Sequence, residues 1–135
     1  MNRRDFLTAT AAVTLAMPLA AQAAARDYAP DLLAAELAAG KTVFLDFRAS
    51  WCSTCAAQGR VIEALLQENP AYARAISFIN VDWDRWGNGD LVKALNIPRR
   101  STLVVLKGKA ELGRVVAQTG KAEIKALLDL ALAAA

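Results

Sequence analysis

The sequence contains no histidine and only two cysteines among its 135 residues. Structural zinc and iron–sulfur centres usually take four ligands, so one copy of this chain cannot build such a site from these residue types alone. No charge of one sign dominates either, because 16 lysines and arginines face 13 aspartates and glutamates. This balance argues against a nucleic-acid binder, which would carry a marked basic patch. The hydrophobic fraction of 56% is ample for the packed core of one domain.

A long hydrophobic run is also missing at the N-terminus. The apolar, alanine-rich stretch over residues 9–21 is shorter than the roughly 20 residues that a membrane span needs. Arg3 and Arg4 precede it, which is typical of a removable export signal. Together with Phe6 and Leu7, the two arginines resemble the twin-arginine signal, which directs folded proteins to an export machinery. We therefore expect an exported protein.

Small residues at the end of this segment predict where the signal is removed. Cleavage after residue 23 or after residue 25 fits equally, so we expect a signal peptide over 1–23 and a domain over 26–135. An uncleaved segment that tethers the protein to the membrane is the alternative. Removal lowers the net charge from +3 to +2. Export indicates the periplasm, an oxidising compartment in which an unassisted cysteine pair tends to become a disulfide.

Both cysteines lie in the segment Trp51-Cys52-Ser53-Thr54-Cys55, where a strand-like run over 42–47 gives way to a helical pattern. Cys52 is expected in the first helical turn, where free backbone N–H groups and the positive end of the helix dipole stabilise a thiolate. Cys55 follows at i+3 on the same face, close enough to form a disulfide with Cys52. One thiol can attack a disulfide while its neighbour resolves the product, which indicates thiol–disulfide exchange.

Two other interpretations of the cysteine pair stay open. A structural disulfide would close so short a loop that it would remove little entropy from the unfolded chain. A metal half-site would need a second chain or an external thiol to complete four-coordinate geometry.

The rest of the chain alternates between helical and strand-like patterns. Helices are predicted over 29–39, 52–69, 90–95 and 121–133, and strands over 41–47, 76–81, 102–106 and 112–116, the last two forming a hairpin. A turn-rich connection is predicted over 82–89. Strand–helix–strand units pair in parallel through right-handed crossovers, and a hairpin adds antiparallel strands. The fold class is therefore α/β, with a central mixed sheet of about four strands between helices in a three-layer α/β/α arrangement.

At this point the chain resembles the thioredoxin family from about residue 30 to residue 133. The specific part is the segment Leu45-Asp46-Phe47-Arg48-Ala49-Ser50-Trp51-Cys52-Ser53-Thr54-Cys55, which is similar to the family's strand-to-helix signature. The resemblance implies that Cys52 is the attacking thiol, Cys55 the resolving thiol, and that the two form a redox-active disulfide. It also implies that Trp51 shapes the surface that substrates meet, and that no bound cofactor is required.

Asp46 is a carboxyl group in the middle of an apolar strand. Burial disfavours the charged form, so its pKa should be raised. Below the cysteines it could accept the proton of Cys55, the role that the family resemblance implies. A carboxylate satisfied by hydrogen bonds at a strand end is the alternative.

The family carries a cis-proline in the loop that faces the cysteines, and here Ser101 stands at that position. Pro98 lies three residues too early. A cis bond before a residue other than proline costs about 2.5–4 kcal/mol, which favours a trans bond and a different loop. The same loop brings Arg99 and Arg100 near the sulfurs, and Arg48 replaces a common aromatic residue of the family. Positive charge there would lower the pKa of Cys52 or favour an acidic partner, unless the arginines are simply solvated.

We therefore expect Trp51, Arg99, Arg100 and Ser101 to face the substrate. The predicted function is an exported thiol–disulfide oxidoreductase that reduces or exchanges disulfides in protein substrates and takes part in cell redox homeostasis. Its expected partners are protein disulfides, the twin-arginine export machinery and a membrane electron donor. A disulfide-forming oxidase is one alternative. The other is a metal or iron–sulfur carrier in which Cys52 and Cys55 of paired chains share the metal.

Overall fold

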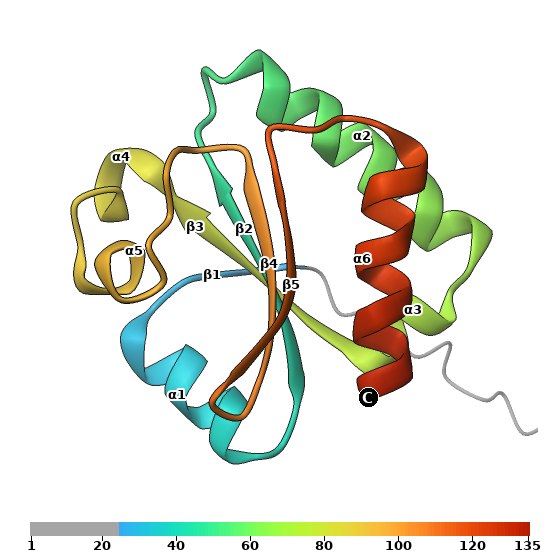
Figure 1. The fold of residues 1–135 in the computed structure, drawn as a ribbon, viewed down its shortest axis with the longest axis horizontal. Coiled ribbons are helices and arrows are strands. Elements are labelled where there is room, and N and C mark those ends of the chain that lie inside the picture. The colour runs from blue at the N-terminus through green and yellow to red at the C-terminus, as the bar shows by residue number, and fades with distance from the viewer. Residues whose placement is uncertain (1–24) are drawn as a thin grey trace, which may run out of the picture.

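The computed structural model of the chain describes residues 25–135 (Figure 1). The predicted export signal over residues 1–23 lies outside this range, and its cleavage stays a prediction. Among residues 25–135, no helix is both long enough and apolar enough to cross a membrane.

Five strands form one mixed sheet in the order β1-β3-β2-β4-β5. They are β1 (Arg26–Asp27), β2 (Thr42–Arg48), β3 (Ile76–Asp82), β4 (Thr102–Lys107) and β5 (Ala110–Val116). The first three pair in parallel, whereas β4 runs antiparallel to both β2 and β5. The antiparallel pairing of β4 with β5 is the predicted hairpin. The expected count of about four strands was one too low. The missing strand is β1, whose two residues are too few to show an alternating pattern.

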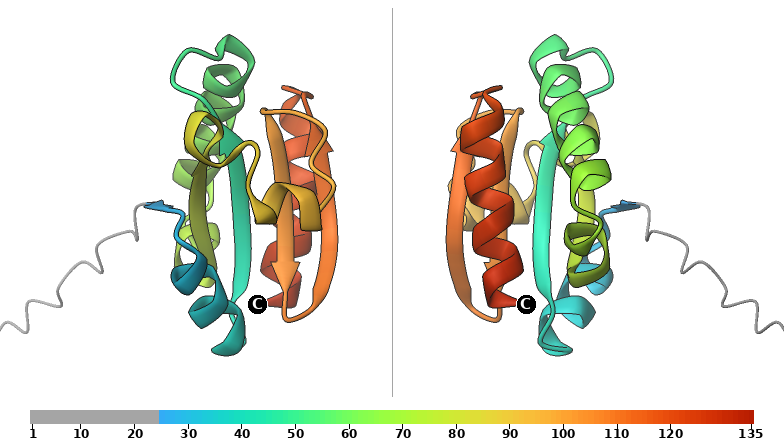
Figure 2. Two further views of the ribbon diagram at one scale, coloured as in Figure 1. Left: turned by 90° about the vertical axis from the view of Figure 1, so that its left-hand side faces the viewer. Right: turned by 90° about the vertical axis from the view of Figure 1, so that its right-hand side faces the viewer.

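Helices cover both faces of this sheet and complete the predicted three-layer fold (Figures 1 and 2). On one face lie α2 (Ser53–Glu68), α3 (Ala71–Ala75) and α6 (Lys121–Ala134). On the other lie α1 (Pro30–Ala38), α4 (Trp83–Trp86) and α5 (Asp90–Ala94). The short helices α3 and α4 were not predicted, and α4 stands where a turn-rich connection was expected.

The central strand β2 is buried on both faces, as its unbroken apolar run predicted. Phe44 packs with Phe78 into the core beneath α2 and α6, whereas Leu45 packs into the core on the side of α1. Side chains alternate along a strand, so Asp46 lies on the same face as Phe44. The fold thus buries the carboxyl group of Asp46 on the α2 side of the sheet, near the end of the strand that leads to the cysteines.

Candidate active site

Helix α2 begins at the cysteine pair, as predicted. Cys52 is the N-cap residue with extended backbone angles, and its sulfur accepts a hydrogen bond of 3.2 Å from the backbone N–H of Cys55. The backbone N–H of Cys52 donates to the carbonyl of Ala49 at 3.2 Å, which closes the turn after β2. The backbone N–H of Cys55 and the positive end of the helix dipole are therefore both directed at the Cys52 sulfur.

The two thiols have opposite acidities. Burial raises the pKa of Cys52, but hydrogen bonds with Cys55, Ser101 and Arg100 outweigh burial and bring it below its usual value, to about 7. Burial also raises the pKa of Cys55, and the neighbouring Cys52 raises it further. Only the thiolate attacks a disulfide, so Cys52 is the better nucleophile of the pair at neutral pH.

Trp51 forms the exposed part of the site. Its side chain is 58% exposed, whereas Cys52 and Cys55 are 4% and 1% exposed. The indole N–H donates to both carboxylate oxygens of Asp84, at 3.0 and 3.1 Å. The guanidinium of Arg100 lies over the other side of the indole, 4.6 Å from the ring centroid. Asp84 and Arg100 therefore both contact Trp51 while more than half of its side chain stays exposed, and its place at the substrate surface stays a prediction.

The three arginines predicted near the sulfurs have different surroundings. Arg100 helps lower the pKa of Cys52. Arg99 is half-buried and its Nε–H donates to the carbonyl of Arg100 at 3.0 Å. Arg48 pairs instead with Asp46, since its Nη1 lies 3.9 Å from Oδ2 of that carboxyl group. The expectation that Arg48 acts on Cys52 is corrected accordingly, because β2 directs its side chain to the same face as Asp46.

Ser101 lies beneath the sulfurs rather than on the exposed surface where we expected it, because it has no exposed area. Its hydroxyl oxygen is 3.2 Å from Sγ of Cys52 and 3.1 Å from Sγ of Cys55. No peptide bond among the described residues is cis, so the bond before Ser101 is trans. The loop adapts through the backbone of Ser101, whose φ of 65° lies in the left-handed region.

The sequence analysis missed Gln58, which holds this loop in place. Its side-chain amide donates to the carbonyl of Ser101 at 2.9 Å and to the carbonyl of Gln118 at 3.0 Å. A signal was present, because Gln58 lies at i+3 from Cys55 on the face of α2 that also buries Ile62 and Leu65. A polar side chain in a buried helical stripe has to find partners, and here they are loop carbonyls.

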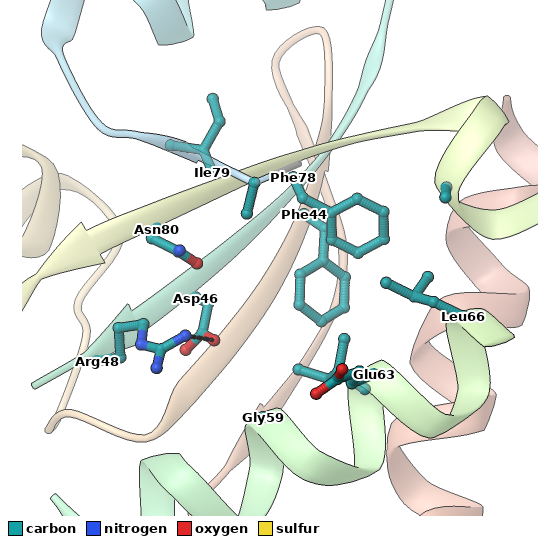
Figure 3. A pocket seen from close by; sticks show the side chains of 12 residues that line it. Phe44, Asp46, Arg48, Gly59, Glu63, Leu66, Phe78, Ile79 and Asn80 are labelled. Atoms are coloured by element: carbon teal, nitrogen blue, oxygen red, sulfur yellow. Dashed lines mark ion pairs between the residues drawn. The ribbon is translucent and has the colours of Figure 1, made fainter. Parts of the chain in front are cut away.

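Asp46 lines a cavity of about 320 Å³ between α2 and the sheet (Figure 3). Burial raises the pKa of this carboxyl group to about 6, and the nearby Arg48 offsets part of the effect. Its Oδ1 has no hydrogen-bond partner among the described protein atoms. Phe44 and Phe78 line an apolar part of the same cavity.

No hydrogen bond joins Asp46 to Cys55 among the described residues. The cavity beside Asp46 is large enough to hold water, but Cys55 is not among the residues that line it. The role of Asp46 as proton acceptor stays a prediction.

The metal hypothesis rests on the same cysteines. Within residues 25–135, no three or more histidine, cysteine, aspartate or glutamate side chains gather in a way that could hold a metal ion. Cys52 and Cys55 offer two sulfurs, so a four-coordinate site needs a second chain. Sharing of a metal between two chains stays a prediction.

Comparison with known proteins agrees with this geometry. The family model described as Thioredoxin matches residues 26–130. A thioredoxin from Echinococcus granulosus is 29% identical over 86 residues, which cover 64% of this chain and 75% of the relative. Thioredoxin H2-1 from Oryza sativa subsp. japonica is 29% identical over 76 residues, 56% of this chain, and the match spans only 51% of that protein.

Solved structures show the same fold. Thioredoxin from Malassezia sympodialis superposes with a TM-score of 0.67 at 23% identity, and the match covers 80% of this chain and 93% of that one. Trxlp from Edwardsiella tarda EIB202 gives a TM-score of 0.66 at 22% identity, over 76% and 97% of the two chains. The chain therefore belongs to the thioredoxin family, and Cys52 and Cys55 form the active-site pair of a disulfide reductase.

Proposed function

We propose that this reductase acts outside the cytoplasm, on disulfides of other proteins. The observation that carries the disulfide chemistry is the contrast between the two thiols. The backbone N–H of Cys55 donates to the Cys52 sulfur at 3.2 Å and the pKa of Cys52 is about 7, whereas the pKa of Cys55 is raised. At neutral pH about half of Cys52 is then a thiolate, while Cys55 keeps its proton until it is needed. The exposed indole of Trp51 offers a protein substrate an apolar surface beside the attacking sulfur.

The reaction proceeds in two exchanges. The Cys52 thiolate attacks one sulfur of the substrate disulfide, forms a mixed disulfide and releases the other substrate sulfur as a thiolate. Cys55 then loses its proton and attacks the Cys52 sulfur. This step forms the Cys52–Cys55 disulfide, breaks the mixed disulfide and leaves the electron pair on the second substrate sulfur. The substrate gains two electrons, and the reductase loses two.

Asp46 accepts the proton of Cys55 in this scheme. A carboxyl group with a pKa of about 6 is mostly ionised at neutral pH and can still hold a proton for a short time. Its Oδ1 has no hydrogen-bond partner among the described protein atoms, so it can accept a proton that water delivers. The charge of Arg48 keeps the pKa of Asp46 from rising further, so the carboxyl group stays ionised at neutral pH and can accept a proton.

The export part of the proposal rests on Arg3, Arg4, Phe6 and Leu7. A twin-arginine signal would take the folded chain to the periplasm. In that compartment the cysteine pair of a reductase is oxidised to a disulfide after one turnover and stays oxidised unless electrons are supplied. A membrane electron carrier that reduces the Cys52–Cys55 disulfide is therefore the proposed donor.

Fractionation of cells that produce the full-length chain tests the location. The wild-type chain should reach the periplasm, while a variant with both Arg3→Lys and Arg4→Lys should stay in the cytoplasm. A variant with Arg99→Lys and Arg100→Lys carries the same kind of change outside the signal and serves as the matched control. Retention of the wild-type chain in the cytoplasm would rule out export but would leave the reductase activity unaffected.

A further inference from the structure

Ser101 is the one side chain that makes hydrogen bonds to both active-site sulfurs within the described part of the chain. Its oxygen is 3.2 Å from Sγ of Cys52 and 3.1 Å from Sγ of Cys55. A hydroxyl group carries one proton and two lone pairs. It can therefore donate to one sulfur and accept from the other at the same time, and it can exchange these two roles by rotation.

The backbone holds this hydroxyl in place. The N–H of Ser101 donates to the carbonyl of Phe47 at 2.7 Å, and its carbonyl accepts from the N–H of Ala117 at 2.8 Å and from the amide of Gln58 at 2.9 Å. Ser101 keeps a φ of 65°, a conformation that side chains other than glycine, asparagine and aspartate seldom adopt. Backbone strain of this kind persists where the surroundings fix it, and it is frequent at functional sites. The hydroxyl is thus positioned against both sulfurs at a conformational cost.

We propose that Ser101 is a catalytic residue whose hydroxyl follows the negative charge from the Cys52 sulfur to the Cys55 sulfur. In the reduced protein the O–H group donates to the Cys52 thiolate, and the oxygen accepts the S–H of Cys55. Once Cys52 is in the mixed disulfide, its sulfur carries no charge and the hydroxyl can turn. It then donates to Cys55 as that thiol gives up its proton to a base. Ser101 forms no covalent bond and keeps its own proton throughout.

This proposal rests on the two-step reductase chemistry proposed above but is independent of export. It differs from a purely structural role, because it predicts an effect on both chemical steps. Loss of the hydroxyl should make the Cys52 thiolate harder to form and should also slow the attack of Cys55 on the mixed disulfide. A residue that only supported the loop would change stability while leaving the acidity of Cys52 unaltered.

Three substitutions separate the hydroxyl from the backbone. Ser101→Gly removes the hydroxyl and relieves the positive φ, and Ser101→Ala removes the hydroxyl but keeps the Cβ atom. Ser101→Thr keeps a hydroxyl and serves as the rescue variant. Arg100, which also lowers the pKa of Cys52, is unchanged in all of them, so its charge contributes equally. Thermal unfolding identifies any variant that does not fold, and the glycine and threonine variants suffice if the alanine variant fails.

The first measurement is the pH dependence of Cys52 alkylation by iodoacetamide. The second is rapid mixing with Ellman's reagent, in which the second release of thionitrobenzoate reports the attack of Cys55. In the glycine and alanine variants we expect the alkylation midpoint to rise by about one pH unit and the second release to slow by about tenfold. The proposal would be overturned if both variants kept the wild-type alkylation midpoint and released the second thionitrobenzoate at a rate within twofold of wild type. An effect seen in the alanine variant alone would also overturn it. Failure of the wild-type protein to reduce insulin disulfides would instead refute the proposed function.

Discussion

At the scale of single residues, two thiols three positions apart are made unequal by their surroundings. Cys52 stands at the first turn of α2, with the backbone N–H of Cys55 directed at its sulfur. Cys55 lies one turn further into the helix and is almost fully buried, so its thiolate is disfavoured. The start of α2 therefore produces one thiol that ionises readily and a second that stays protonated at neutral pH.

This asymmetry predicts different outcomes for two serine substitutions. Cys52→Ser should reduce insulin disulfides no faster than the uncatalysed background, because the attacking thiolate is gone. Cys55→Ser should instead accumulate a mixed disulfide between Cys52 and the substrate, because the resolving thiol is missing. Non-reducing gel electrophoresis and mass spectrometry of the trapped species measure both. Trapping through Cys55 in the Cys52→Ser variant would reverse the assignment.

Asp46 should make the folding stability depend on pH. Its pKa rises on folding to about 6, from an ordinary value near 4, because burial disfavours the charged form. The folded state then binds more protons than the unfolded state between about pH 4 and pH 6, so stability falls as the pH rises through this range. Asp46→Asn removes this loss. We expect it to raise the unfolding free energy at pH 8 by on the order of 2 kcal/mol, measured by urea unfolding.

The same variant provides its own control. At pH 4 Asp46 is almost fully protonated in the folded wild-type chain and about half protonated in the unfolded chain, so the difference between variant and wild type should shrink to a small fraction of its value at pH 8. A difference that is equal at both pH values would mean that Asp46 is not titrating near pH 6. In turnover, the asparagine variant should be slower in the second exchange alone.

Local sequence was enough to find the residues of one segment but not their partners. Cys52, Cys55, Trp51 and Asp46 lie within ten residues of each other, and the strand-to-helix transition fixes their relation. Ser101 reaches the sulfurs across 46 and 49 positions of sequence, so its contact depends on how β4 pairs with β2. Its positive φ and the Asp84 contact to Trp51 likewise arise only from tertiary placement.

At the scale of elements, periodicity identified the long ones and failed on the short ones. The stripes of α2 and α6 and the apolar run of β2 repeat often enough to be recognised. The two residues of β1 span one period of a strand, and the four of α4 span little more than one helical turn. Neither is long enough to show a repeating pattern, so tertiary contacts define them. The sheet edge formed by β1 was consequently missed.

Within α2, Gly59 offers a direct test of helix propensity. A Cβ atom at this position meets no other atom within 4 Å, because it points toward open space at the cavity. Gly59→Ala should therefore raise the unfolding free energy by about 0.5–1 kcal/mol, the usual gain for alanine over glycine inside a helix. The urea midpoint at constant slope measures this gain.

Gly40 is the matched control for that substitution. It follows α1 with a φ of 76°, and a Cβ atom there also meets nothing within 4 Å. Space is equal at the two positions and only the backbone differs, so Gly40→Ala should destabilise by about 1 kcal/mol. If both variants shifted the midpoint in the same direction, the backbone argument for Gly59 would be wrong.

At the scale of the whole molecule, the sheet order joins three distant segments into one redox site. The start of α2, directly after β2, supplies the cysteines, the loop before β4 supplies Ser101 and Arg100, and the start of α4 supplies Asp84. The α/β class and the carboxyl end of β2 as the place of the site could be predicted, since connectivity rules restrict both. The chemistry between the segments could not, because it depends on side chains brought together by the complete fold.

The equilibrium potential of the Cys52–Cys55 pair reports that combined environment. As a reductase, the protein should equilibrate with dithiothreitol near the value of about −270 mV found for thioredoxin, far from the about −120 mV of a strong oxidant. Arg100 stabilises the Cys52 thiolate and hence the reduced form. Arg100→Gln should therefore shift the potential by about 10–30 mV to more negative values.

Arg99→Gln removes the same charge from the same loop, but Arg99 bonds to the carbonyl of Arg100 and not to Cys52. The potential of the Cys52–Cys55 pair in the Arg99→Gln variant should therefore stay close to that of the wild type. An equal shift in both variants would mean that general loop charge, rather than the contact with the sulfur, sets the potential. A wild-type value near that of the strong oxidants would show that the fold stabilises the dithiol so strongly that electrons flow from substrates to the protein, and the direction proposed for the reaction would have to be reversed.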